Sequence, residues 1–393
     1  MAIAKSTRII SLDVLRGIVM VVMALDHVRD YFHLGAMYND PTNLETTTPV
    51  LFFTRFITHF CAPVFIFLAG TSAFLYGRNK TKNQLFRFLF TRGVWLVFIE
   101  LTLMTTLWWF DLSYGFFNLQ VIWAIGLCMI ILSFLIYLPK KVLIIIGLLL
   151  VFGHNALDGV TAEGTSFGSI IWYILHQSNF VQLGDRYVSF LYPILPWIGV
   201  IALGYAFGNL YHREFHSKLR KKWLLWLGLG SIVLFFVIRG INIYGNMTPW
   251  EVQDEATYTI LSFLNVTKYP PSLLFLLITL GPAILFLYIA ENWRNAVADF
   301  FLVFGRVPFF YYVIHVFVIH VAAMIGLLIT GKDWKLMILS NDTIESGVLS
   351  DYGYSLGVVY LVWIGIVLFL YPFSKWYMTY KANNRDKWWL SYL

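Results

Sequence analysis

Arg16 and His27 stand eleven residues apart within one apolar segment of the sequence. In a helix, eleven steps of about 100° return to within roughly 20° of the same face, about 16 Å further along the axis. The guanidinium group of arginine is a planar charged donor that suits phosphates, whereas a neutral histidine can accept a proton from a nucleophile. The spacing therefore predicts an anion-binding group and a general base on one side of one helix.

Carboxylates accompany both residues. Asp13 lies one turn before Arg16, while Asp26 and Asp30 flank His27. A carboxylate beside a histidine can fix its tautomer, as a general base requires. We therefore expect Asp26 or Asp30 to orient His27. The alternative is that His27 is a helix-end histidine at the membrane interface.

Other apolar segments also contain ionisable residues. An ionisable residue at the centre of a bilayer costs about 2.5–3.5 kcal/mol on insertion scales, so such residues usually face the bundle interior and mark a functional path. The alternative for each arginine is a structural pairing with a carboxylate or with backbone carbonyls. The residues concerned are Arg55 and His59 in the second segment, Arg92 and Glu100 in the third, Arg239 in the seventh, and Arg306, His315 and His320 in the ninth.

The elements that carry these residues are predicted from composition. Hydrophobic residues make up 59% of the 393 residues and charged residues only 12%, against about 25% charged in soluble chains. This excludes a cytosolic enzyme, a secreted disulfide scaffold and a disordered chain. We predict an all-α polytopic membrane protein, a single domain over residues 1–393. Its ten expected transmembrane helices are 10–31, 51–77, 88–110, 119–138, 142–157, 188–210, 223–243, 271–290, 299–328 and 353–373.

The distribution of basic residues predicts the orientation. With the N-terminus inside, the inner segments carry 18 Lys and Arg residues and the outer segments 5, which agrees with the positive-inside rule. Both termini are therefore expected in the cytoplasm. The longer loops, 32–50, 158–187, 244–270 and 329–352, are expected outside, with short interfacial helices at 167–176 and 258–266. The charge of +7 thus reflects topology, and we expect no nucleic-acid partner.

Several stretches resemble known transmembrane acyltransferases. The pattern of an arginine, ten intervening residues and a histidine, which Arg16 and His27 reproduce, resembles that of the acyltransferase-three family of bacterial sugar O-acyltransferases. The sequence is more similar to the bacterial relatives of the heparan-α-glucosaminide N-acetyltransferase family, over nearly the whole chain. The stretches that carry the resemblance are Arg8 to Gly17, Asp26-His27, His59 to Gly70, Pro193 to Gly204, Lys268 to Ser272, Gly281-Pro282 and Gly305 to His315.

The resemblance implies transfer of an acyl group, such as acetyl, from cytoplasmic acyl-CoA to a hydroxyl or amine of a sugar or cell-envelope glycan outside a bacterial cytoplasmic membrane. Pro49 stands in the neighbourhood where the heparan enzyme has an external histidine, so His27 and His59 are the nearest candidates. The expected roles are catalytic for His27, Asp26 and His59, substrate-binding for Arg55, Glu100, His315 and Asp30, and donor-binding for Arg16, Arg92 and Arg306.

Other interpretations remain open at this point. The same charges could form the binding site of a transporter or exporter of a polar or anionic solute, or belong to a non-catalytic scaffold. Lipids, acyl-CoA and the acceptor are the expected partners, and a homodimer is an open alternative. His315 and His320 are five residues apart, a poor helical spacing for a shared metal, so no metal site is predicted.

Overall fold

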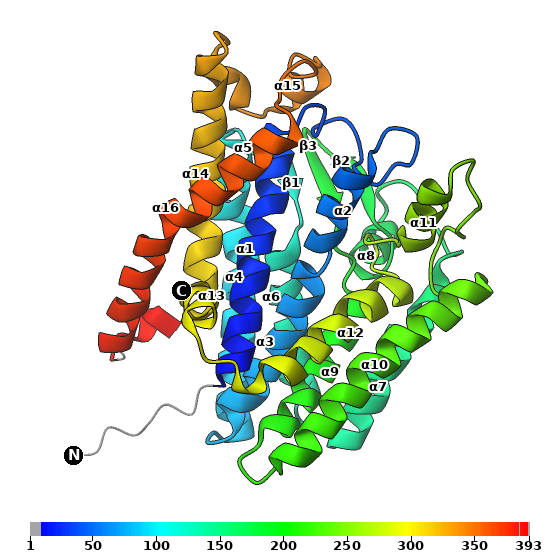
Figure 1. Cartoon of the computed structure of the whole chain (residues 1–393), viewed down its shortest axis with the longest axis vertical. Coiled ribbons are helices and arrows are strands. Elements are labelled where there is room, and N and C mark those ends of the chain that lie inside the picture. The colour runs from blue at the N-terminus through cyan, green and yellow to red at the C-terminus, as the bar shows by residue number, and fades with distance from the viewer. Residues whose placement is uncertain (1–8, 385, 392–393) are drawn as a thin grey trace.

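The structure, a computed structural model, describes residues 9–384 and 386–391. Lys5, Arg8 and Arg385, which the sequence analysis counted among the inner basic residues, lie outside the described residues. Long helices run side by side through the molecule, and α1 crosses its middle (Figure 1). The helices are α1 (Ile10–Phe32), α2 (Pro49–Thr58), α3 (Cys61–Gly77), α4 (Lys82–Ile99), α5 (Thr105–Trp109), α6 (Val121–Leu135), α7 (Lys140–Gly153), α8 (Phe167–Leu175), α9 (Leu195–Phe207), α10 (Ser217–Ile241), α11 (Ala256–Leu264), α12 (Leu273–Ile289), α13 (Ala296–Arg306), α14 (Pro308–Ile329), α15 (Asn341–Glu345) and α16 (Leu356–Asn383).

Seven helical stretches of the described chain are long and apolar enough to cross a membrane. Helices α6 and α9 are apolar but shorter. Helix α1 has 23 residues, but five Asp and Arg side chains interrupt its apolar sequence. Each of the ten predicted spans overlaps a helix. The structure therefore confirms a mostly helical membrane protein, while the number of spans and the side of each terminus stay predictions.

Two predicted spans are interrupted. The expected helix 299–328 is two helices, α13 and α14, which meet at Val307. Pro308 begins α14, and a proline disfavours helical geometry in the residue before it. The second span breaks between α2 and α3 at His59 and Phe60, and not at Pro63. Pro63 instead lies in the first turn of α3, where its missing N–H removes no helical hydrogen bond.

A small sheet was not predicted. Strands β1 (Phe116–Asn118), β2 (Asn179–Leu183) and β3 (Arg186–Phe190) lie in the order β1-β3-β2. Strand β3 is parallel to β1 and antiparallel to β2, and it occupies the start of the predicted span 188–210. The two expected interfacial helices are present as α8 and α11.

Helix α1 is the centre of the bundle and is buried along most of its length. It packs against α3, α13, α14 and α16. Its closest approach is to α13: a Cβ added to Gly17 would lie 1.8 Å from the backbone oxygen of Phe301, and one added to Gly305 would lie 1.8 Å from that of Asp13. Glycine at both positions therefore lets the two backbones touch, and this contact fixes the surroundings of Arg16.

Candidate functional site

His27 and His315 form a buried pair between α1 and α14. Nδ1 of His27 lies 2.7 Å from Nε2 of His315, and Nδ1 of His315 lies 2.9 Å from the backbone oxygen of Tyr311. A carbonyl can only accept, so the Nδ1 of His315 carries the proton and its Nε2, in the neutral ring, accepts from His27. His27 is thereby protonated on Nδ1, which leaves a lone pair on its Nε2. No described residue hydrogen-bonds to that Nε2, and His27 lines a cavity.

The carboxylate of Asp26 makes a different set of contacts from the one expected. It accepts from Arg55 at 2.5 Å and from the hydroxyl of Thr58 at 2.9 Å, and Arg29 lies 3.0 Å away. Asp30 pairs with Arg29 at 2.5 Å. The expectation that Asp26 or Asp30 orients His27 is therefore wrong, because His315 occupies the Nδ1 of His27. The two carboxylates instead hold two arginines at the edge of the cavity.

The His27 cavity, of about 280 Å³, lies between α1, α2 and the sheet region. Its polar lining includes three of the predicted site residues, Asp26, Asp30 and Arg55. Lys268 and Tyr269 also line it. Burial tends to raise the pKa of the Tyr269 phenol, but the positive charges of Lys268 and Arg55 outweigh this and hold that pKa below its ordinary value. The cavity thus combines the imidazole of His27 with several positively charged side chains.

An apolar cavity of about 340 Å³ adjoins the His27 cavity. The two share Met23, Phe65 and Val121 in their linings. At its other end the apolar cavity reaches Arg16 and Arg92. Helix α1 therefore lines both spaces, with its lower arginine at one end and its histidine at the other, as the spacing of eleven residues predicted.

A third cavity opens at the arginine end. It is lined by Arg16, Arg78 and Arg306 and shares Arg16, Ser72 and Tyr76 with the apolar cavity. Arg16 is held in place because it donates to Asp13 at 2.9 Å, to Ser72 at 3.0 Å and to the backbone oxygen of Gly305 at 3.1 Å. Three cavities that share lining residues thus extend from a group of arginines to His27.

Other predicted residues lie elsewhere. His59 is buried beside another polar cavity, of about 440 Å³, that shares Arg55, Lys268 and Tyr269 with the His27 cavity. Glu100 is buried in the π-helical turn Glu100–Met104, where it accepts from the backbone of Gln120 at 3.1 Å. The structure does not bring His59 or Glu100 to His27.

Two ionisable residues of the spans have structural surroundings. Arg239 donates to the backbone oxygens of Thr248, Ser262, Phe263 and Asn265 at 2.9–3.1 Å. The ring nitrogens of His320 face the backbone oxygens of Leu107 and Met337. For these residues the structural alternative is the better description.

Sequence reasoning missed several residues of the His27 cavity. Lys268 and Tyr269 stood inside a stretch that carried the family resemblance, so that signal was available. Arg29 was counted as a residue of a span end, but it is only 4% exposed. Trp108 contacts the ring of His27 at 4.7 Å between centroids, and no spacing in the sequence indicated that contact.

The family model described as heparan-alpha-glucosaminide N-acetyltransferase, catalytic, matches residues 8–244, which is more than half of the chain. No curated protein matches it. The match covers α1 with Arg16 and His27, and it confirms the family resemblance inferred from the motifs.

Proposed function

We propose that this chain, which belongs to the heparan-alpha-glucosaminide N-acetyltransferase family, transfers an acyl group from acyl-CoA to a hydroxyl or amine of a sugar. The family indicates a membrane acetyltransferase. The observation that carries the proposal is the run of three adjoining cavities between the arginines and His27.

The arginine end suits the phosphates of acyl-CoA. Guanidinium groups bind phosphate through charge-assisted, often bidentate hydrogen bonds. Arg16, Arg92 and Arg306 line the cavities at this end. Under the predicted topology this end faces the cytoplasm, where acyl-CoA is found. The apolar cavity then suits the long arm of the donor, and about 16 Å of helix separates Arg16 from His27.

The base is His27. Its Nε2 accepts the proton of the acceptor hydroxyl or amine while the acceptor oxygen or nitrogen attacks the carbonyl carbon of the thioester. The carbon–sulfur bond then breaks, and the CoA thiolate takes the proton back from Nε2. The products are the acylated acceptor and free CoA thiol, so the enzyme returns to its starting protonation state.

His315 acts through His27. It is completely buried, so it is placed to hold the tautomer of His27 and not to touch the acceptor, which replaces the substrate-binding role expected for it. The acceptor would approach through the polar cavity that shares Arg55, Lys268 and Tyr269 with the His27 cavity. Fixed donors near a reacting carbonyl also stabilise the negative charge that develops on its oxygen.

The test uses the full-length protein in lipid vesicles with labelled acetyl-CoA on one side and glucosamine on the other. We expect acetylated sugar and free CoA in equal amounts, only when the donor is supplied on the arginine side. Solute flux without any acyl product would instead support the transporter interpretation and refute the proposal.

A further inference from the structure

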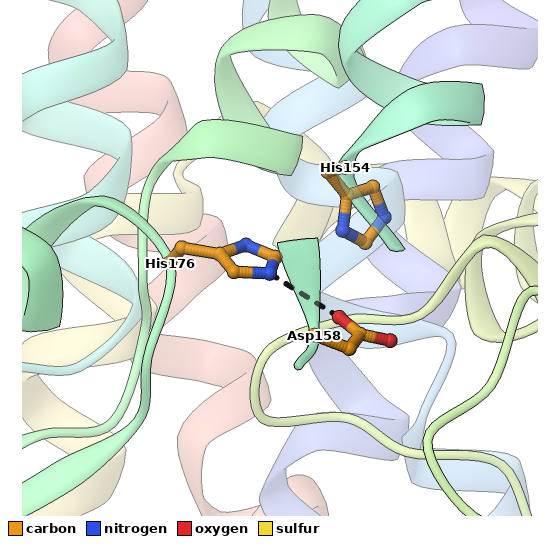
Figure 2. Close-up of side chains that lie close together, drawn as sticks. All are labelled: His154, Asp158 and His176. Atoms are coloured by element: carbon orange, nitrogen blue, oxygen red, sulfur yellow. Dashed lines mark hydrogen bonds and ion pairs between the residues drawn. The ribbon is translucent and has the colours of Figure 1, made fainter. Parts of the chain in front are cut away.

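A second group of ionisable side chains lies at the end of α7, where none of its members lines the His27 cavity. His154 and Asp158 follow α7 in and just after the 3₁₀ turn His154–Leu157, and His176 ends α8. The three side chains face one another (Figure 2). One potential ligand atom from each lies within 4.8 Å of those of the other two.

The histidines of this group lack the hydrogen bonds that buried imidazoles usually make. His154 is 2% exposed, and neither of its ring nitrogens has a partner among the described residues. His176 is 1% exposed; its Nε2 lies 3.2 Å from Oδ1 of Asp158, while its buried Nδ1 has no partner in the described chain. Buried polar atoms without partners are rare and call for an explanation, and a bound ion supplies one.

The carboxylate is held in the orientation that a metal ligand needs. Oδ2 of Asp158 accepts from the side-chain amide of Asn155 at 2.8 Å, and Oδ1 of Asn155 accepts from the backbone N–H of Leu273 at 2.9 Å. Asn155 thus connects Asp158 to the start of α12, and Oδ1 of Asp158 is left to face the histidines. Outer hydrogen bonds of this kind orient ligating carboxylates in metal proteins.

We propose that His154, Asp158 and His176 bind one divalent transition-metal ion, with Zn²⁺ as the best match to two imidazoles and a carboxylate. Three protein ligands and one water is a common zinc arrangement, and Zn–N distances of about 2.0–2.1 Å place tetrahedral ligand atoms roughly 3.4 Å apart. The His176–Asp158 contact, at 3.2 Å, is close to this separation, and the ligand atom of His154 lies within 4.8 Å of both partners, so it must move closer to them to complete the site. The ion would join the end of α7 to the end of α8.

The test is metal binding by the full-length protein in detergent after chelator treatment. Zinc chloride is added, excess is removed on a desalting column, and bound zinc is counted by mass spectrometry. We expect one zinc per chain. Asn155→Ala should weaken binding by about 10–100-fold, as for a lost outer partner, and His154→Gln or His176→Gln should weaken it further.

The control is His212→Gln, because His212 is a partly exposed histidine near Glu214. This variant should leave the stoichiometry and affinity unchanged. Zinc should also raise the unfolding temperature of the wild-type protein but not that of His154→Gln, since only binding to the folded state stabilises it. Much less than one zinc per chain, or equal affinity in wild type and His154→Gln, would overturn the proposal.

Discussion

Replacing His315 by leucine removes the atom that accepts from Nδ1 of His27, at 2.7 Å. The Nδ1–H is buried between α1 and α14, so leaving it unpaired costs about 1–3 kcal/mol. His27 avoids this cost by carrying its proton on Nε2 instead, and that tautomer has no lone pair on Nε2 to accept the proton of the acceptor. At about 1.4 kcal/mol per factor of ten, kcat should fall roughly 5–150-fold.

The matched variants are His315→Gln and His315→Asn. Glutamine can reach far enough to place its side-chain oxygen where Nε2 of His315 lies, so it should retain most of kcat. Asparagine is shorter, so it can keep the contact with Tyr311 but not the one with His27, and it should resemble leucine. Steady-state kinetics with acetyl-CoA separate kcat from KM, and calorimetry with CoA should give the same affinity for all three variants. Wild-type kcat in His315→Leu, or equal loss in the leucine and glutamine variants, would refute the tautomer argument.

Further expectations concern the charged residues. Arg92→Ala and Arg306→Ala should each weaken CoA binding about tenfold or more in calorimetry, because each variant lacks a charge-assisted donor. Unchanged CoA affinity in both variants would indicate that these arginines have a structural role instead. Arg239→Met should lower the free energy of unfolding by about 2–4 kcal/mol in denaturant titration because buried carbonyls lose a charged donor, while Arg186→Met, which removes a half-exposed side chain, should change it little. Ultraviolet titration should detect one tyrosine that ionises below the ordinary pKa near 10, and this ionisation should be absent in Tyr269→Phe. Because the pKa of Tyr269 is lower in the folded than in the unfolded protein, its ionisation stabilises the fold. This stabilisation is fully present above pH 10 and is lost as the pH falls through the folded pKa. An identical titration curve in the variant would contradict that assignment.

Much of the helical plan could be predicted because apolar length and helical period are local properties of the sequence. The common face of Arg16 and His27 follows from a spacing of eleven residues, and both residues line cavities along α1 as expected. The split at Val307 had a local signal in Pro308. It was missed because the apolar sequence continues through the proline.

Pairings between distant segments could not be predicted. His27 and His315 are 288 residues apart, and the charged neighbours of His27 in the sequence pointed to the wrong partner. In a helix, adjacent residues such as Asp26 and His27 point about 100° apart, so the carboxylate faced Arg55 on α2. The small sheet is a similar case, since strand β1 has three residues and pairs with a strand far along the chain.

The proposed function depends on His27 acting as the general base, and one measurement tests this role directly. Acetyl transfer and CoA affinity are compared in wild type, His27→Gln and the surface control His212→Gln, after thermal unfolding has shown that all three are folded. Loss of a general base typically costs a factor of about 10²–10⁴ in rate. We expect such a loss of kcat in His27→Gln with CoA affinity unchanged, whereas a folded His27→Gln protein with near-wild-type turnover would contradict the assignment of His27 as the general base.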